Sequence, residues 1–271
     1  MVVTDLDGTL LHPGGSVSKL DLDTLDELGS RNILRVIATG RSLYSTNKVL
    51  HRDIPIDYLI FSSGAGILDW HSHRIVQKHT MHASQVESAA LLLQEMNLEF
   101  MIHHPIPDNH RFYYFGTGKN NPDFLRRLEI YREYAVMANA TNFIYRDASQ
   151  IVVVEPHTGE KSSHAIIAYK LDGLTVIRTT SPIDGSSTWI EIFPPAVSKS
   201  QAAEWIRCQC GLPYSSILAV GNDYNDFDLL TWAPQRFVVK NAPPELKSRF
   251  RSVKSSEESG FSEAVKRWLR K

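Results

Sequence analysis

The first two acidic residues, Asp5 and Asp7, stand one residue apart, just after the apolar run Met1-Val2-Val3. Residues i and i+2 of a strand share a face, so both carboxylates point toward one site at the strand end. Two acids this close repel each other unless they share a proton or a cation lies between them. Mg²⁺ prefers oxygen ligands, and it binds one or two carboxylates together with substrate phosphates. The pair therefore indicates metal-assisted phosphate chemistry, with a solvated Asp-Gly turn as the alternative.

A second group of oxygen ligands lies in the segment 221–226, which reads Gly-Asn-Asp-Tyr-Asn-Asp and is followed by Asp228. The segment comes directly after the apolar run 217–220, so we expect a strand-to-helix loop there. Amide and carboxylate oxygens at this density suit a divalent hard cation. An Asx-rich turn is the structural alternative.

Two expected helix starts carry groups that suit an anion. The segment 198–201, Ser-Lys-Ser-Gln, has the form of a capping box and places Lys199 in the first helical turn. A cation is unfavourable beside the positive end of the helix dipole, so we interpret Lys199 as serving a bound anion rather than as a surface lysine.

The segment 39–41, Thr-Gly-Arg, follows the apolar run 33–38. We expect Thr39 to cap a helix whose free N–H groups attract anions.

Apolar runs at 33–38, which Arg35 interrupts, and at 58–61 and 217–220 are typical of buried parallel strands, and small or polar residues follow each of them. Helical patterns lie between them, which indicates βαβ units and an α/β, doubly wound parallel sheet. Ligands of such sheets bind outside the carboxyl ends of the strands. The polar segments described above all fall at those ends, so we expect them to meet.

The middle of the chain has a different pattern, typical of an α+β domain. We therefore expect a core formed by residues 1–79 and 190–271, interrupted by an inserted domain at residues 80–189. A closing helix over 261–269 completes the expected core. Within the insertion, the patterns predict helices at 84–96, 122–134 and 164–171, with the first opening on a capping box at Ser84, and strands at 98–103, 111–115, 151–154 and 174–179. They also predict a strand at 189–193, which crosses the expected boundary.

Composition excludes several other classes of protein. The 271 residues carry a formal net charge of -1 and a pI near 6.8, so no nucleic-acid footprint is expected. The sequence contains no apolar run near the ~20 residues that span a bilayer and no secretory signal pattern, so no membrane partner is expected. Cys208 and Cys210 are the only cysteines, which favours a reducing, cytoplasmic location. The histidines lack zinc-site spacing.

Together, the segments at residues 5–11, 39–41, 198–201 and 221–226 resemble, in this order, the four motifs of the haloacid dehalogenase superfamily. The insertion resembles the large cap of its Cof-type phosphatases, a branch that includes sugar-phosphate phosphatases and phosphomannomutase. The resemblance implies a Rossmann-like core with an inserted α+β cap that determines substrate specificity. It covers nearly the whole chain.

The resemblance also implies catalytic roles. Asp5 corresponds to the nucleophile that accepts the phosphoryl group. Asp7 corresponds to the general acid and then the general base. Thr39 holds the transferring group, and Lys199 neutralises its charge.

The implied ligands fall into two sets. The metal is Mg²⁺, with Asp5, Asp7 (through its backbone carbonyl), Asn222 and Asp226 as its residues. The implied substrate-binding residues are Gly40, Arg41, Gly64 and Ala65, the last two through their backbone N–H groups.

The sequence departs from the family pattern at two positions. Asn222 stands where an Asp is usual, which removes one formal charge and leaves Asn222 and Asp223 as alternative metal ligands. The segment 63–65 reads Ser-Gly-Ala where Asn-Gly-Ala is usual, so Ser63 reaches less far.

We therefore expect a Mg²⁺-dependent phosphatase that hydrolyses a small phosphorylated metabolite through an aspartyl-phosphate, with a sugar phosphate favoured by the resemblance. Two alternatives remain open. One is a phosphomutase or other phosphotransferase on the same scaffold. The other is a non-catalytic phospholigand-binding protein, which the residue Asn222 favours. The sequence gives neither the substrate nor the oligomeric state.

Overall fold

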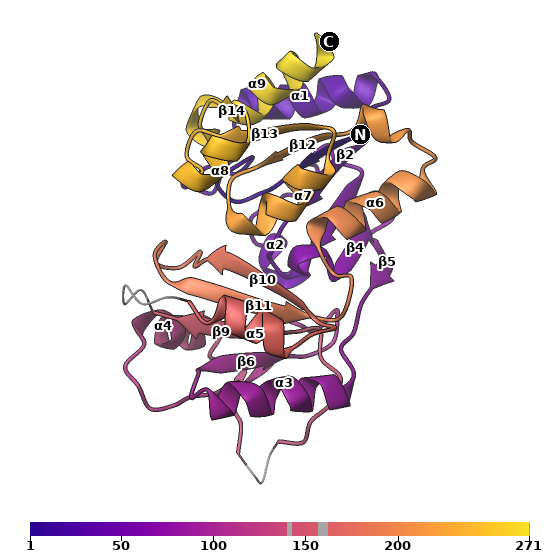
Figure 1. Cartoon of the computed structure of the whole chain (residues 1–271). Helices are drawn as coiled ribbons and strands as arrows, with labels where there is room; N and C mark the ends of the chain where they lie inside the picture. Colours follow the sequence, from indigo (N-terminus) through magenta and orange to yellow (C-terminus); the bar gives the residue numbers. More distant parts are fainter. Residues whose placement is uncertain (140–142, 157–161, 271) are drawn as a thin grey trace. The chain divides into compact units, whose positions relative to one another are not determined.

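The computed structural model describes residues 1–139, 143–156 and 162–270 and divides into two compact units. The first unit comprises Met1–Lys78 and Ser198–Lys271, and the second comprises His79–Val197 (Figure 1). The boundary that we expected between residues 189 and 190 falls inside strand β11 (Thr188–Phe193). This strand is hydrogen-bonded to neighbours on both sides within the second unit, so the unit ends only after the strand does.

The first unit is built on a sheet with the strand order β14-β13-β12-β1-β2-β3-β4-β5. The strands from β14 to β3 are parallel, and β4 and β5 add an antiparallel edge. The central strand β1 has β12 on one side and β2 on the other, so the chain's first strand lies between two later ones. The strands are β1 (Val2–Thr4), β2 (Arg35–Ala38), β3 (Tyr58–Phe61), β4 (Gly66–Asp69), β5 (Arg74–Lys78), β12 (Leu218–Gly221), β13 (Gln235–Val239) and β14 (Ser252–Val253).

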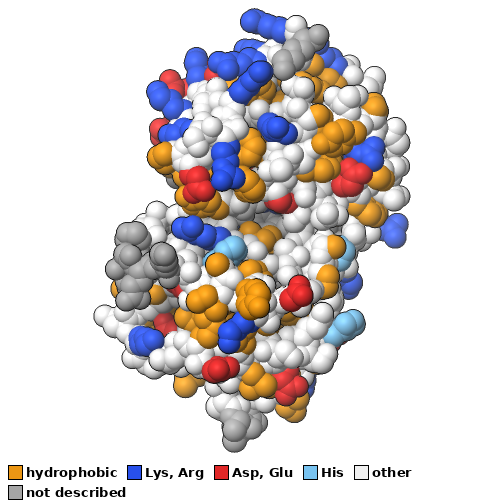
Figure 2. Space-filling model, in the orientation of Figure 1, with side chains coloured by type: hydrophobic (Ala, Val, Ile, Leu, Met, Phe, Trp, Pro, Cys, Tyr) orange, Lys and Arg blue, Asp and Glu red, His pale blue; other side chains and the backbone are white. Residues whose placement is uncertain are grey.

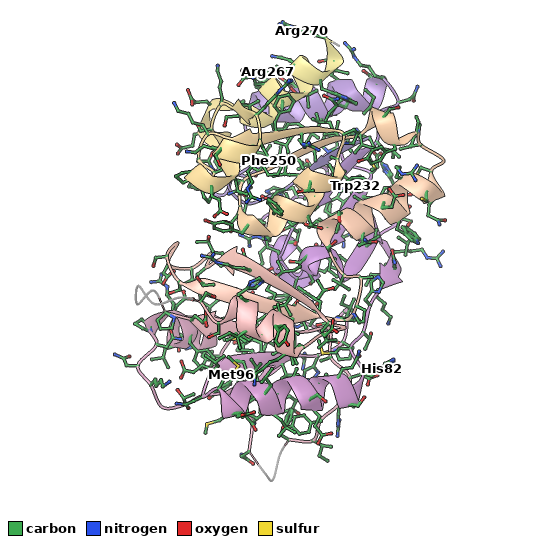
Figure 3. The ribbon with its side chains drawn as sticks, viewed as in Figure 1. His82, Met96, Trp232, Phe250, Arg267 and Arg270 are labelled. Atoms are coloured by element: carbon green, nitrogen blue, oxygen red, sulfur yellow. The ribbon has the colours of Figure 1, made fainter. Side chains whose placement is uncertain are left out.

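Helices cover both faces of this sheet, as expected for a doubly wound fold (Figure 1). Helices α1 and α9 pack together on one face, and α6, α7 and α8 lie on the other. On the latter face, Val3 and Val36 share a buried core with Ile206 and Leu230, and the partly buried Trp232 packs against it (Figure 3). The helices are α1 (Lys19–Ser30), α2 (Leu43–Thr46), α6 (Lys199–Gln209), α7 (Phe227–Trp232), α8 (Pro244–Arg249) and α9 (Gly260–Leu269).

The second unit contains a sheet with the strand order β10-β11-β9-β6-β7-β8. Its pairings are antiparallel except for the parallel pair β7 and β8. Apolar side chains of α3 and α5 pack on one face of the sheet, and Phe124 of α4 packs on the other. The elements are α3 (Ala83–Glu95), β6 (Phe100–His103), β7 (Phe112–Phe115), α4 (Pro122–Ile130), β8 (Ala135–Met137), β9 (Gln150–Glu155), α5 (His164–Lys170), β10 (Thr175–Thr180) and β11.

The start of α3 differs from our expectation of a capping box at Ser84. His82 is the N-cap, and its backbone N–H donates to Oε1 of Gln85 at 3.0 Å. Figure 3 shows His82 and the C-cap residue Met96 at the two ends of this helix. Because Gln85 accepts from His82, the helix begins at Ala83, one residue before Ser84.

Charged side chains are spread unevenly over the face of the first unit that Figure 2 shows. Figure 2 shows Lys and Arg side chains gathered over the upper part of this face. The exposed cations of the C-terminal helices include Lys247 on α8 and Lys266 and Arg267 on α9. Cys208 and Cys210 are exposed free thiols. Among the described residues, no helix is both long and apolar enough to cross a membrane.

Candidate active site

Strand β1 delivers the two acids of the first motif to the carboxyl end of the sheet. The backbone N–H of Asp5 donates to the carbonyl of Val220 at 2.9 Å, which continues the pairing of β1 with β12. The chain then turns at Gly8, whose φ of 72° lies in the left-handed region that favours glycine. The Asp5 side chain is 6 % exposed, whereas that of Asp7 is 40 % exposed. The two acids therefore have different environments although they share one loop.

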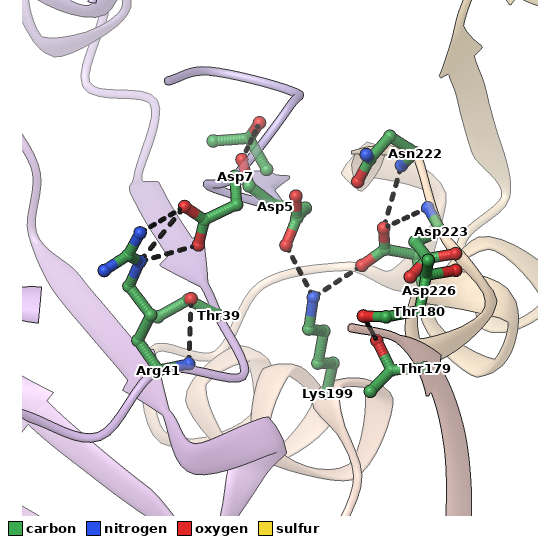
Figure 4. A network of polar contacts seen from close by, with 11 residues as sticks. Asp5, Asp7, Thr39, Arg41, Thr179, Thr180, Lys199, Asn222, Asp223 and Asp226 are labelled. Atoms are coloured by element: carbon green, nitrogen blue, oxygen red, sulfur yellow. Dashed lines mark hydrogen bonds and ion pairs between the residues drawn. The ribbon is translucent and has the colours of Figure 1, made fainter. Parts of the chain in front are cut away.

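Helix α6 places a buried ammonium between two carboxylates (Figure 4). Ser198 is its N-cap, and the Ser198 hydroxyl accepts from the backbone N–H of Gln201 at 3.2 Å. Lys199, the first helical residue, is fully buried, and its Nζ donates to Oδ1 of Asp5 at 2.7 Å and to Oδ1 of Asp226 at 2.6 Å. The two acids compensate a cation that the helix dipole disfavours.

The charges of this triad shift one another's pKa values. Burial and the nearby Asp226 raise the pKa of Asp5 to about 7, although Lys199 opposes the shift. Burial disfavours the Lys199 ammonium, but the attraction of Asp226 and Asp5 is stronger, so the pKa of Lys199 is raised. Removing one partner of such a buried pair typically costs about 3–5 kcal/mol, because the remaining charge is left uncompensated.

Asp226 also fixes the loop after β12. Its Oδ2 accepts from the backbone N–H groups of Asn222 at 2.8 Å and Asp223 at 3.1 Å. We expected Asp226 to complete a Mg²⁺ site, directly or through water. Both of its oxygens accept hydrogen bonds within the chain, and its part in metal binding stays a prediction. Asn222 lies against the β1 loop, because a β-carbon on Gly8 would be 2.7 Å from its Nδ2. The structure thus brings Asn222 to the edge of the Asp5–Asp7 loop, and Asp226 reaches Asp5 through Lys199.

The segment 39–41 follows β2 and reaches the same loop. Thr39 is buried, and its Oγ1 accepts from the backbone N–H of Arg41 at 3.1 Å. Our prediction that Thr39 caps a helix is wrong, because α2 begins at Leu43 with Ser42 as its N-cap. The extended backbone of Ser42 separates Thr39 from the helix.

Arg41 forms a bidentate ion pair with Asp7 (Figure 4). Its Nε lies 3.0 Å from Oδ1 and 2.8 Å from Oδ2 of Asp7, and its Nη2 lies 2.7 Å from Oδ1. Bidentate guanidinium–carboxylate pairs are directional as well as strong. Arg41 therefore fixes the orientation of the second acid.

The loop after β3 joins two of these segments. The backbone N–H of Ser63 donates to the carbonyl of Thr39 at 3.0 Å. Gly64 has φ 106°, and a β-carbon there would lie 2.2 Å from the carbonyl oxygen of Ser198. We expected the N–H groups of Gly64 and Ala65 to be available to a substrate. For Ala65 this was wrong, because its N–H donates to the carbonyl of Ser62 at 2.9 Å.

Two polar residues without an assigned role hold the site together. Oδ2 of Asp228 accepts from the backbone N–H of Ser200 at 2.9 Å and so fixes the first turn of α6. Nδ2 of Asn241 donates to the carbonyl of Gly8 at 2.7 Å, while its Oδ1 accepts from the backbone N–H of Ser256 at 3.0 Å. Asn241 follows β13, so the signal that marks the other loops, a polar residue after a parallel strand, was also present here.

The residues present fit a hard cation at the Asp5 loop. Oδ2 of Asp5 is buried and has no hydrogen-bond partner in the described part of the chain. This buried oxygen belongs to the loop against which the Asn222 amide lies, and carboxylate and amide oxygens suit Mg²⁺. Among the described residues, no three His, Cys, Asp or Glu side chains form a metal-binding group. A cation here would therefore depend on amide and carbonyl oxygens as well as on acids.

The chain matches the haloacid dehalogenase-like hydrolases over residues 2–265, and it belongs to that family. It is 24 % identical to the 5-amino-6-(5-phospho-D-ribitylamino)uracil phosphatase YwtE of Bacillus subtilis, covering 96 % of this chain and 95 % of the relative. It is 21 % identical to an HMP-PP phosphatase of Yersinia pseudotuberculosis, covering 98 % and 93 %.

A solved structure described as the subclass IIB sugar phosphatase BT4131 superposes on the chain with a TM-score of 0.76 at 15 % identity. It covers 98 % of both chains. At this level of identity, the similarity concerns the fold. The predicted fold class, a doubly wound α/β core with an inserted α+β domain, is confirmed, and the chain is an enzyme of the hydrolase class.

Proposed function

We propose that this enzyme is a Mg²⁺-dependent phosphatase that hydrolyses a small phosphorylated metabolite through an aspartyl-phosphate. The observation that carries the proposal is the buried contact of Lys199 with Asp5, with Asp7 two residues further on the same loop. A carboxylate paired with one fixed cation, in a water-poor site, suits attack on an anionic phosphate because the ammonium offsets the repulsion.

The Asp5 carboxylate, the backbone carbonyl of Asp7 and the Asn222 side chain are the proposed ligands of Mg²⁺. When bound, the ion polarises the phosphoryl oxygens and offsets negative charge. Asp223 is the alternative to Asn222. Asp226 acts on the same site by fixing Lys199 and the backbone of Asn222.

In the first step, a carboxylate oxygen of Asp5 forms a bond to phosphorus while the ester P–O bond breaks. The leaving oxygen takes the proton carried by Asp7. Thr39 and the backbone N–H of Gly40 hold the transferring group, and Lys199 neutralises its oxygens. Phosphoryl transfer depends chiefly on such positioning and charge neutralisation.

In the second step, a water molecule attacks phosphorus and gives a proton to Asp7. The bond between Asp5 and phosphorus breaks, inorganic phosphate leaves, and Asp5 is restored. Splitting the hydrolysis in this way replaces one difficult displacement with two easier ones. Asp7 thus returns to the protonated state that the first step needs.

A sugar phosphate is the substrate class that we favour. The relatives include enzymes whose names specify a phosphoribityl compound and HMP-PP, and one structural neighbour is named a sugar phosphatase. These substrates are all small phosphorylated molecules. We assign substrate selectivity to the second unit, because the proposed chemical groups all belong to the first.

A phosphate-release assay with Mg²⁺ over a broad panel of phosphate esters tests the proposal. The wild type should release phosphate from at least one sugar phosphate, and Asp5→Asn should reduce turnover to background. Retained turnover in Asp5→Asn would refute the role of Asp5. If no ester is hydrolysed but radiolabelled phosphate moves from a hexose bisphosphate to a sugar hydroxyl, the enzyme is a phosphotransferase.

A further inference from the structure

The ion pair between Asp7 and Arg41 conflicts with the role proposed for Asp7. Both oxygens of Asp7 accept hydrogen bonds from the guanidinium of Arg41. The guanidinium thus engages both oxygens and holds the carboxyl group of Asp7 toward Arg41 rather than toward a substrate. For Asp7 to turn to a leaving oxygen, its contact with Arg41 has to be exchanged before the first step.

The site contains a second ion pair, which shows that Arg41 is the partner able to leave. Lys199 is fully buried and Asp5 only 6 % exposed, so separating these two charges would leave both in a water-poor environment. Arg41 and Asp7 are 31 % and 40 % exposed. Water can solvate each of them when they separate, and exposed ion pairs contribute little to stability.

The backbone around Arg41 does not have to move in this exchange. Its N–H donates to Oγ1 of Thr39, and its carbonyl accepts from the N–H of Ser62 at 2.8 Å. The helix that follows starts immediately, with Ser42 as its N-cap. Rotation of the Arg41 side chain is therefore sufficient to break its contact with Asp7.

A phosphate monoester is the ligand best suited to take Arg41 from Asp7. Its oxygens match the fork of a guanidinium as well as a carboxylate does, and it carries up to two negative charges rather than one. The bound phosphate belongs beside Asp5, and Asp7 lies on the same loop two residues away. An arginine on Asp7 is thus close to the position where a phosphate would arrive.

We propose that Arg41 is a phosphate-responsive latch, which holds Asp7 in the absence of substrate and exchanges it for a phosphoryl oxygen when substrate binds. This inference rests on the proposed phosphatase function and adds a positioning role for Arg41. The exchange frees the Asp7 carboxyl group only when a phosphate group is present. The general acid is therefore assembled by the substrate itself.

Binding of inorganic phosphate tests the latch without any turnover. Calorimetric titrations of the full-length, Mg²⁺-loaded protein compare the wild type with Asp7→Asn, Arg41→Gln and the double variant. Asp7→Asn removes the competitor, so phosphate should bind more tightly by about fivefold or more. In the Arg41→Gln background the same change should tighten binding by no more than about twofold, because no latch remains to be released.

The double-mutant cycle separates competition from simple charge removal. If Asp7 and Arg41 acted on phosphate only as independent charges, Asp7→Asn would change the phosphate affinity equally in the wild-type and Arg41→Gln backgrounds. Equal changes would therefore overturn the latch. Absence of phosphate binding in all four proteins would overturn it as well, even if the ester assay shows that the enzyme is a phosphatase. Near-wild-type thermal unfolding would confirm that each variant folds, and Arg41→Lys, which lacks the guanidinium fork, should retain less than the full coupling.

Discussion

Nζ of Lys199 lies 2.7 Å from Oδ1 of Asp5, although 194 positions separate the two residues in the sequence. The contact joins the first motif of the chain to the first turn of α6, and Asp226 completes it from the loop after β12. Asp5 alone would be a buried acid with unfavourable charge. Lys199 makes that charge tolerable and holds Oδ1 of Asp5. Oδ2 of Asp5 has no hydrogen-bond partner among the residues that the structure describes.

Replacing Lys199 with Met should remove activity and destabilise the protein. The change leaves Asp5 and Asp226 buried without their cation, so we expect the free energy of unfolding of the Mg²⁺-free protein to fall by about 3–5 kcal/mol. Chemical denaturation and phosphate release measure the two effects. Lys266→Met, at an exposed position of α9, is the matched control and should change neither by much. Full activity in Lys199→Met would remove the lysine from the proposed chemistry.

Chelation and the variant Asn222→Asp test the proposed metal site. EDTA should stop phosphate release, and added Mg²⁺ should restore it. Because a carboxylate replaces an amide, Asn222→Asp should bind Mg²⁺ as tightly as the wild type or more tightly. Calorimetric titration of the metal measures this affinity directly. Much weaker binding by a folded Asn222→Asp variant would show that this side chain is not a ligand of the proposed kind.

Gly64→Ala should disrupt the start of α6. The new β-carbon would meet the Ser198 carbonyl oxygen at 2.2 Å, and φ at this position is 106°. We expect a loss of stability of about 2 kcal/mol or more, together with a large loss of activity, because Ser198 caps the helix that carries Lys199. Gly173→Ala is a suitable control, since Gly173 has φ 93° and no atom of the described residues lies within 4 Å of its β-carbon position. Equal effects of the two changes would assign the loss to backbone strain alone.

His103 makes the stability of the second unit dependent on pH. Burial and the nearby charge of Arg127 lower the pKa of His103 to about 3, and its Nδ1 lies 2.7 Å from the carbonyl oxygen of Asn109. The folded state therefore holds a neutral ring, whereas the unfolded chain takes up a proton below about pH 6.5. The unfolded state binds more protons in this range, so the free energy of unfolding falls as the pH falls.

His103→Gln removes this titration. The stability advantage of the wild type over the variant should therefore shrink by about 2 kcal/mol between about pH 6.5 and about pH 5. Urea unfolding at both pH values measures the difference, and titrations of the other histidines cancel in it. A difference that is the same at both pH values would show that His103 titrates alike in the folded and unfolded states.

Much of the architecture could be predicted because local patterns and tertiary packing agree. The apolar run at 58–61 is strand β3 as expected, and the polar residues that follow the parallel strands do meet at one edge of the sheet. The misfit of a cation in a first helical turn predicted an anion beside Lys199, and Asp5 and Asp226 are the anions that contact it. In each case the physical reason for the structure, whether an apolar run or an unfavourable charge, could be seen in a few neighbouring residues.

Contacts between side chains of distant loops could not be predicted in the same way. The pairing of Arg41 with Asp7 depends on how far each side chain reaches across the sheet edge, and no spacing in the sequence encodes that distance. The N–H of Ala65 donates to the carbonyl of Ser62 in a tight turn. Ser62 has a left-handed φ of 49°, which a serine in the sequence does not predict. The boundary after β11 likewise depends on strand pairing rather than on local composition.

The inserted segment His79–Val197 contributes none of the residues to which we assign a chemical step. Mutagenesis libraries confined to this segment can therefore search for new substrates while the reaction centre stays chemically intact. Exchange of this segment during evolution would likewise change the substrate while the residues of the reaction centre stayed the same. Selectivity and reactivity can thus diversify separately within a single polypeptide.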